Sequence, residues 1–221
     1  MASRPRMSLA AVARWRAPFL IGTLVVGVLL MVGLTVAGTW VRGVLFFLTL
    51  ALYVGLVVGA LVAQSKHPAE LVEQDGDRVT VATPGLTLLA AAFTLMVTGF
   101  VANDIADALA GGLWTGDVVI DAVWTAWAGF AWYAALGPND VRLGPDGLVE
   151  RLPHGSMVVP WEALESATAG PRNRVTLTFR DRQAVVWRGL RRKRGVLNPT
   201  TKASYLADAI NSAVRARSAR R

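Results

Sequence analysis

Four apolar stretches without a charged residue occupy most of the first 138 residues of the chain. They are Ala17–Thr39, Gly43–Ala63, Thr83–Asn103 and Ala122–Pro138, each 17 to 23 residues long. A helix rising ~1.5 Å per residue needs ~20 apolar residues to cross a ~30 Å hydrocarbon core. Composition agrees, because 53% of the residues are hydrophobic and only 17% are charged. The sequence therefore predicts an α-helical membrane domain with four transmembrane helices.

The charges between these stretches predict how the chain crosses the membrane. The segment before the first stretch is basic, the loop 64–82 contains Lys66 and Arg78, and the loop Asp104–Asp121 contains four Asp and no base. Residues 139–221 hold 16 Lys and Arg against seven Asp and Glu. Because basic segments stay in the cytoplasm, we expect both termini to be cytoplasmic. The Ala-, Val-, Gly- and Arg-rich composition suits a bacterial plasma membrane. The first apolar run exceeds the roughly 7–15 residues of a signal peptide, so it is expected to remain as a span.

Small residues recur at four-residue spacing in the second stretch. They are Ala51, Gly55, Gly59 and Ala63. Such spacing lines one helix face with small side chains and lets a neighbouring backbone approach closely. The stripe fits two interpretations, namely the seam of a homo-oligomer or packing against the first or third span of the same chain. The expected three-residue turn Trp40–Arg42 after the first span favours packing within the chain.

Polar groups that could carry chemistry are scarce in the membrane part. Asp104, Asp107 and Asp121 lie at span ends on the predicted outer side. They fit either a cation or proton site of a small transporter or channel component, or a solvated acidic loop. The spans contain no His, Glu or Lys, no HExxH pair and no Ser/Lys dyad, which argues against a membrane protease. The chain has no Cys, which excludes disulfides and thiolate metal sites. We expect no enzyme activity, no cofactor and no metal.

The periodicity changes after Pro138. Alternating apolar residues and tight turns predict five short strands: Val141–Leu143, Leu148–Leu152, Met157–Val159, Arg174–Arg180 and Ala184–Arg188. A helix is predicted to begin with Thr200 or Thr201 as N-cap, and its apolar face contains Tyr205, Leu206, Ala209, Ile210, Ala213 and Val214. The expected fold is a small α+β domain, an antiparallel β-meander or barrel capped by one helix. Trp161, which follows a strand, is the expected anchor of its core.

These patterns divide the chain into four segments. They are a cytoplasmic segment 1–16, a transmembrane domain 17–138, a cytoplasmic domain 139–217 and a basic tail 218–221. The loop between the second and third spans has two interpretations. Asp75-Gly76 before Val79-Thr80-Val81 predicts a β-hairpin, but a short helix Pro68–Glu73 followed by a turn also fits.

The C-terminal pattern resembles the bacterial pleckstrin-homology-like (PH-like) domains. The resemblance covers residues 139–217 and is carried by the turn at Gly147, Val159-Pro160-Trp161, the strand Val175–Phe179 and the closing helix. Five strands are two fewer than that fold contains, so one further strand is expected in Glu165–Ala169 and another in the loop 64–82. Family members that follow a pair of spans look like protein-docking or assembly modules, and the resemblance implies this role here. The turn Pro145–Gly147 carries no base, so the resemblance implies no inositol phosphate site.

Basic residues concentrate before the last helix, at Arg188, Arg191, Arg192, Lys193 and Arg194. They fit contact with anionic lipid headgroups, worth ~1 kcal/mol per base near the surface, or a solvated loop that only follows the charge rule. No aromatic residues are interleaved, so we do not expect nucleic-acid binding. The sequence thus predicts a membrane protein presenting a cytoplasmic PH-like domain for docking, assembly or regulation at the inner membrane face. Its expected partners are the lipid bilayer, anionic headgroups and an unidentified protein. The alternative function is a small transporter or channel component.

Overall fold

The computed structural model describes residues 15–110, 118–190 and 194–219. The chain forms two compact units that interleave along the sequence. The first contains Met1–Ser65 and Thr83–Leu136, and the second contains Lys66–Ala82 and Gly137–Arg221.

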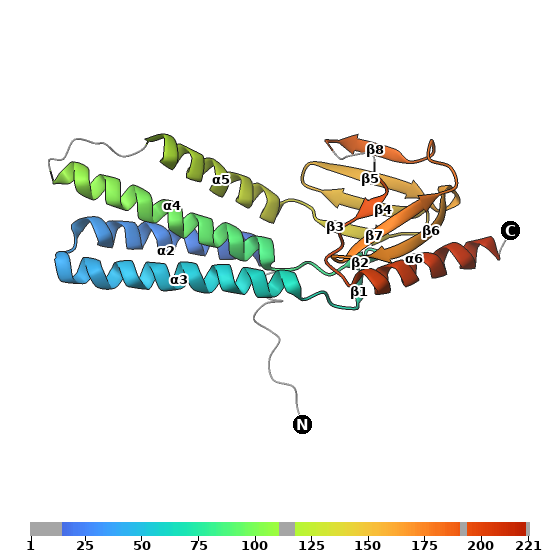
Figure 1. Cartoon of the computed structure of the whole chain (residues 1–221), viewed down its shortest axis with the longest axis horizontal. Coiled ribbons are helices and arrows are strands. Elements are labelled where there is room, and N and C mark those ends of the chain that lie inside the picture. The colour runs from blue at the N-terminus through green and yellow to red at the C-terminus, as the bar shows by residue number, and fades with distance from the viewer. Residues whose placement is uncertain (1–14, 111–117, 191–193, 220–221) are drawn as a thin grey trace, which may run out of the picture. The chain divides into compact units, whose positions relative to one another are not determined.

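Four long apolar helices form the first unit. They are α2 (Arg16–Val36), α3 (Thr39–Ser65), α4 (Gly85–Leu109) and α5 (Val118–Leu136) (Figure 1). All four are long and apolar enough to cross a membrane, so the prediction of four spans is confirmed and the chain is a multi-pass membrane protein. The break between the first two spans lies at Ala37 and Gly38, and α3 has already begun at Thr39. The expected turn Trp40–Arg42 is therefore the first turn of α3, and this part of the prediction was wrong.

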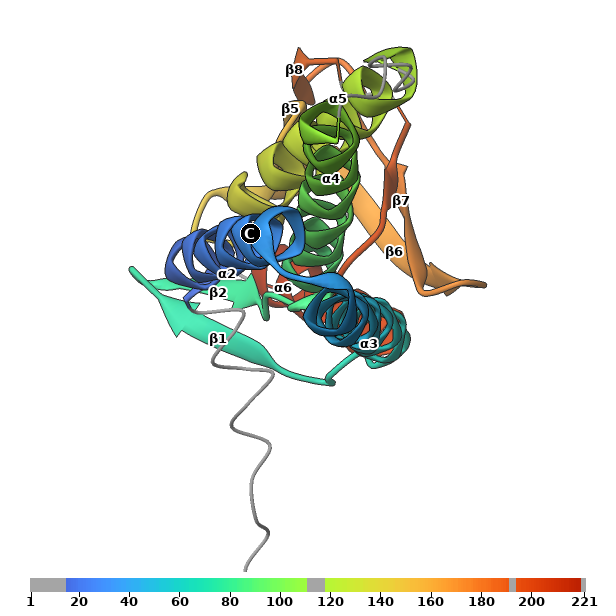
Figure 2. The same cartoon turned by 90° about the vertical axis from the view of Figure 1, so that its left-hand side faces the viewer.

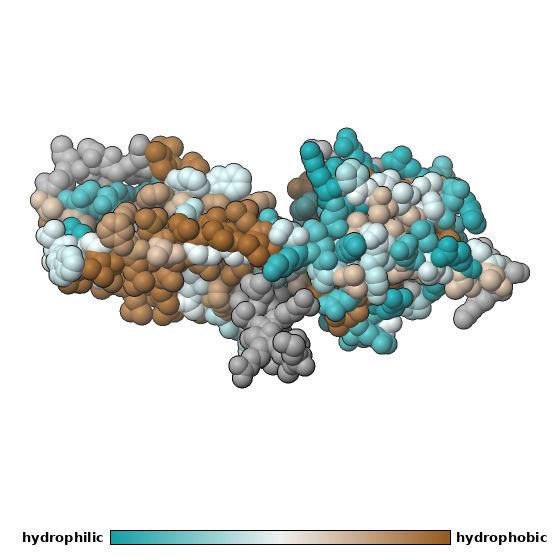
Figure 3. Space-filling view, turned by 60° about the horizontal axis from the view of Figure 1, so that its bottom comes forward, coloured by the Kyte–Doolittle hydropathy of each residue, from teal (hydrophilic) through white to brown (hydrophobic). Residues whose placement is uncertain are grey.

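Helix α4 is the centre of the first unit and packs against α2, α3 and α5 (Figure 2). Its packed faces consist largely of Ala, Gly and Thr, which allow close approach. At one crossing, a Cβ on Gly27 of α2 would lie 2.9 Å from Oγ1 of Thr98 in α4. At another, Trp132 of α5 donates a hydrogen bond from Nε1 to Oγ1 of the buried Thr94, at 2.8 Å. The outer faces of α2, α3 and α5 expose apolar side chains and suit contact with lipid. Figure 3 shows one apolar face of the first unit in brown.

The second unit contains two antiparallel sheets and one helix. Sheet A has the strand order β1 (Leu71–Gln74), β2 (Asp77–Thr80), β3 (Asp140–Leu143), β4 (Gly147–Leu152), β5 (Gly155–Pro160) and β8 (Val186–Gly189). Sheet B has the order β6 (Leu164–Gly170), β7 (Arg174–Phe179) and β9 (Val196–Leu197). Helix α6 (Ala203–Ser218) contacts β6 and β7. An antiparallel β region capped by a C-terminal helix is the predicted fold class, and it is confirmed.

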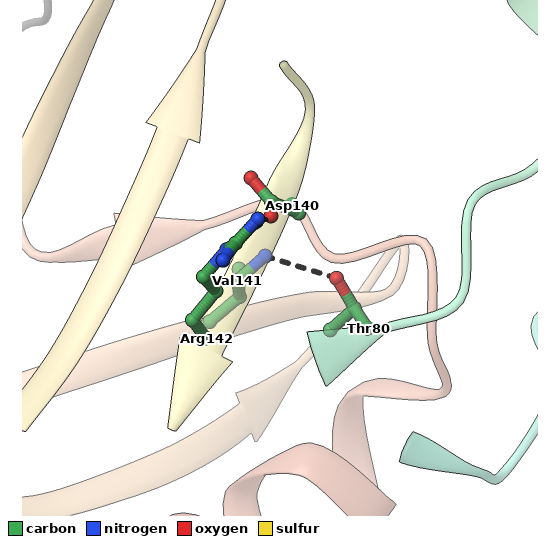
Figure 4. A network of polar contacts seen from close by, with 4 residues as sticks. All are labelled: Thr80, Asp140, Val141 and Arg142. Atoms are coloured by element: carbon green, nitrogen blue, oxygen red, sulfur yellow. Dashed lines mark hydrogen bonds and ion pairs between the residues drawn. The ribbon is translucent and has the colours of Figure 1, made fainter. Parts of the chain in front are cut away.

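The loop between the second and third spans forms the predicted hairpin, not the short helix. Asp75 and Gly76 turn it with positive φ angles of 54° and 83°, as in a type I′ turn. Its second strand, β2, pairs with β3 although 59 residues separate them along the chain. The backbone N–H of Val141 also donates to Oγ1 of Thr80 at 2.9 Å (Figure 4). The second unit therefore includes two strands that lie outside the expected domain 139–217.

The core of the second unit lies between the sheets and α6. Leu206 and Ile210 of the helix are fully buried there, together with Met157 and Val175 of the strands. Trp161 belongs to the same cluster with 4% of its surface exposed, which confirms it as a core residue. The helix apolar face predicted from spacing is thus the face that closes the sheets.

The helix begins later than predicted. Its N-cap is Lys202, which makes no side-chain capping bond, so neither Thr200 nor Thr201 caps it. Instead, the N–H of Ala203 donates to Oδ1 of Asn173 at 2.7 Å. Thr201 is buried and donates to the carbonyl oxygen of Glu70 at 3.2 Å. A residue 30 positions away supplies the cap, and local sequence does not reveal it.

Candidate functional site

All three chain connections between the units leave the second unit at the same end of sheet A. Strand β1 begins at Leu71, and Leu71 pairs with Thr80, the last residue of β2. The hydroxyl of Thr80 accepts a hydrogen bond from the backbone of Val141, one residue after β3 begins. We call this end the linker end, and it is defined by Leu71, Thr80 and Asp140. The connections are short, namely residues 66–70, 81–84 and 137–139. The linker end is therefore the part of the unit that the chain ties to the membrane helices.

The strand register places two arginines at the linker end. Asp140 pairs with Arg151, Arg151 with Ser156, and Ser156 with Arg188. Directly paired residues share a face of the sheet, and neighbouring strands lie ~4.8 Å apart. Arg151 and Arg188 therefore stand about 10 Å apart on one face, with Ser156 between them. Both side chains are exposed. Arg188 belongs to the predicted set of headgroup contacts and Arg151 does not, although Ser156 pairs with both.

An exposed apolar residue follows Arg188. The N–H of Leu190 donates to the carbonyl oxygen of His154 at 2.8 Å, which holds Leu190 beside the β4–β5 turn. Gly189 makes this approach possible, because its φ is +71° and a Cβ there would lie 2.6 Å from the same oxygen. Leu190 is 86% exposed, the highest value for a large apolar residue in the described part of the chain. We call Arg151, Arg188 and Leu190 the basic tip.

The rest of the predicted headgroup-contact loop is only partly described. Arg191, Arg192 and Lys193 lie outside the described residues. Arg194 is described and exposed.

The stripe of small residues in α3 divides into two parts. Ala63 is buried with the neighbouring Ala60, and a Cβ on Gly59 would lie 3.5 Å from Cδ1 of Leu88 in α4. Ala51 is exposed, and a Cβ on Gly55 would meet nothing within 4 Å. The end of the stripe toward Ala63 packs within the chain, as the favoured interpretation requires. The other end faces away from the described helices.

The three acidic residues of the predicted outer side lie on helices. Asp104 and Asp107 belong to the last turns of α4, and Asp121 belongs to the first turn of α5. Asp104 and Asp121 line one cavity of about 890 Å³ together with Arg42 of α3. Asp107 does not line it and accepts a hydrogen bond from Nδ2 of Asn103 at 3.3 Å. No cluster of His, Asp and Glu among the described residues could hold a metal ion.

A second basic cluster lies at the opposite end of sheet A, beside the turn that contains Pro145. The indole N–H of Trp161 donates to the carbonyl oxygen of Gly144 at 3.0 Å. The guanidinium of Arg217, from α6, lies 4.9 Å from the centre of the Trp161 ring and donates to the carbonyl oxygen of Pro145. Arg78 and Arg217 line a cavity of about 310 Å³ there. The turn has no base of its own, but the fold brings two bases to it.

Searches of protein-family models, of curated proteins and of solved structures found no match to this chain.

Proposed function

We propose that this protein is a docking or regulatory module of the inner membrane face. In this proposal the first unit anchors the chain, and the second unit is a cytoplasmic PH-like domain that the basic tip holds against anionic headgroups. The opposite end of sheet A then points away from the membrane, where a protein partner can reach it. The two antiparallel sheets, the segment Val159-Pro160-Trp161 and the closing helix α6 support the resemblance to PH-like domains.

The observation that carries the proposal is that the basic tip lies at the linker end of sheet A. The three-residue connection puts Asp140 four Cα steps after the last residue of α5, at most about 14 Å along an extended chain. The row from Asp140 to Arg188 crosses sheet A at that level, about 14 Å in length. Electrostatic attraction to headgroups acts over ~8 Å at physiological salt. Short connections therefore favour contact between the tip and the lipid.

The pairing of β2 with β3 supports one part of the topology independently of loop charges. These strands precede α4 and follow α5, yet they belong to one sheet. The chain must therefore cross the membrane an even number of times between them, as two spans do. Residues 66–82 and 137–221 then share one side, which the basic composition of the tail makes the cytoplasmic side.

The experiment uses the full chain in nanodiscs, with a polarity-sensitive dye on Ser156→Cys, between the two arginines. The chain has no native Cys, so labelling is unambiguous. We expect the dye to report a less polar environment in anionic than in neutral nanodiscs at low salt. The difference should fade as salt rises and in the Arg151→Gln/Arg188→Gln variant.

The matched control changes the same number of charges elsewhere. Arg180 and Arg215 are both exposed. The backbone N–H of Arg180 donates to the carbonyl oxygen of Ala163, two residues after Trp161 and away from the linker end. The Arg180→Gln/Arg215→Gln variant should retain the lipid-dependent difference. Equal responses of the two double variants, or no difference between lipids, would contradict the proposed orientation.

The second candidate function is a small transporter or channel component. It is favoured by the cavity that brings Asp104 and Asp121 together. Its α3 lining, however, extends only from Thr39 to Tyr53, about two thirds of a ~30 Å hydrocarbon core at ~1.5 Å per residue. Ion flux into proteoliposomes that is lost in Asp104→Asn would support this candidate over the docking module.

A further inference from the structure

The cavity of about 890 Å³ in the first unit has a polar end and an apolar end. Arg42, Asp104 and Asp121 come from the start of α3, the end of α4 and the start of α5. Because consecutive spans run in opposite directions, these three helix ends lie at the same membrane surface. We call these three residues the charged mouth. Deeper in the cavity the lining is mostly apolar and includes Leu50 and Leu95 beside Thr49 and Tyr53.

We propose that this cavity binds one phospholipid whose headgroup carries a phosphate next to a protonated amine, as in phosphoethanolamine lipids. The site is independent of the docking role of the second unit. The lipid would belong to the leaflet on the side of the charged mouth. Its headgroup would lie at the mouth, and one acyl chain would enter the apolar part.

The depth of the cavity fits one leaflet. From Arg42 to Tyr53 the lining of α3 rises by eleven residue steps, or about 16 Å of helix. Half of a ~30 Å hydrocarbon core is ~15 Å. An acyl chain with its headgroup at the mouth would therefore end near the midplane, where the cavity ends. A volume of this size also lies within the usual range of small-molecule sites, ~300–1,000 Å³.

The charges of the mouth select the headgroup. Arg42 is exposed and makes no ion pair within the described part of the chain. Guanidinium groups bind phosphate through charge-assisted hydrogen bonds. The carboxylates of Asp104 and Asp121 line the same space and can accept hydrogen bonds from a primary ammonium. A choline headgroup has no N–H to donate, and a headgroup with only negative charge would be repelled by both carboxylates.

The experiment measures lipid retention by native mass spectrometry of the full chain purified in detergent. Lipids with identical acyl chains and ethanolamine, choline or glycerol headgroups are added in turn. We expect the ethanolamine lipid to be retained about tenfold better than the other two, which corresponds to ~1.4 kcal/mol of binding free energy. Arg42→Gln and Asp104→Asn should each reduce this preference, whereas Asp107→Asn, outside the cavity lining, should preserve it.

A variant that fills the cavity tests the site itself. Gly99 lines the cavity, and a Cβ there would meet nothing within 4 Å, so the side chain of Gly99→Leu starts in open space and adds volume to the cavity. Gly129 in α5 has equally open space but does not line the cavity, so Gly129→Leu is the matched control. We expect lipid retention to be lost in the first variant only, with similar melting temperatures for both. Equal retention of the three lipids, or unchanged retention in Gly99→Leu, would overturn the proposal.

Discussion

Trp161 joins three elements of the second unit through one side chain. Its ring lies in the core, its N–H donates to Gly144, and its face receives the guanidinium of Arg217. The sequence predicts that this residue is buried, because a large aromatic side chain directly after an apolar strand is well placed to enter the core. Its contact with Arg217 is not predictable in the same way, because 55 residues lie between the two and only the closed fold brings them together.

We expect Trp161→Ala to destabilise the second unit strongly. Truncating a buried aromatic residue costs ~3–5 kcal/mol, a large part of a typical total of ~5–15 kcal/mol. Limited proteolysis of the full chain in detergent should cleave the second unit much faster in the variant. Trp161→Phe, which keeps a ring in the core but loses the bond to Gly144, should lie between wild type and Trp161→Ala. Wild-type protection in Trp161→Ala would show that the core does not depend on this residue.

At the scale of elements, the sequence reveals the spans and most strands but not how they are combined. Uncharged stretches and period-two alternation are local signals, and they locate α2 to α5, β3, β4, β5, β7 and β8. The pairing of the hairpin β1–β2 with β3 depends on contacts across two spans, which local patterns do not contain. The same limit applies to the basic tip, because only the strand register through Ser156 shows that Arg151 lies near Arg188.

The hairpin should be necessary for the second unit to fold alone. Residues 137–221 without it would lack β1 and β2 and leave β3 as an exposed edge. We expect this fragment to be poorly folded by circular dichroism. A fragment that joins 66–82 to 137–221 through a short Gly/Ser linker should fold, because β2 and β3 are antiparallel neighbours. Equal melting of the two fragments would show that the hairpin adds nothing to stability.

Two glycines of α3 should differ in their tolerance of a branched side chain. Gly59→Ile would place extra carbons against Leu88, and overpacking of this kind costs ~1–3 kcal/mol. Gly55→Ile meets open space, so the melting temperature of the chain in detergent should fall much less. An equal fall at Gly55 would instead indicate that a second copy of the chain covers this part of the stripe.

For the molecule as a whole, the predicted topology can be tested with single cysteines. Ala110 lies at the C-terminal end of α4 and Asp208 lies in α6, and both are exposed. We expect Ala110→Cys to react with a membrane-impermeant maleimide in intact cells, and Asp208→Cys only after lysis. The wild-type chain has no Cys and provides the blank. Labelling of Asp208→Cys in intact cells would refute the cytoplasmic placement of the second unit.

The interleaving of the two units has a consequence for biosynthesis. Strand β2 leaves the ribosome 59 residues before β3, a delay of about 3–12 s at ~5–20 residues per second. A hairpin of two strands is at best marginally stable alone, so β1 and β2 become stable only when β3 pairs with β2. That neighbour reaches the same compartment only after α4 and α5 have both been inserted. Sheet A can therefore close only after α4 and α5 have entered the bilayer. A chain in which this insertion fails leaves β1 and β2 unpaired and exposed to proteases.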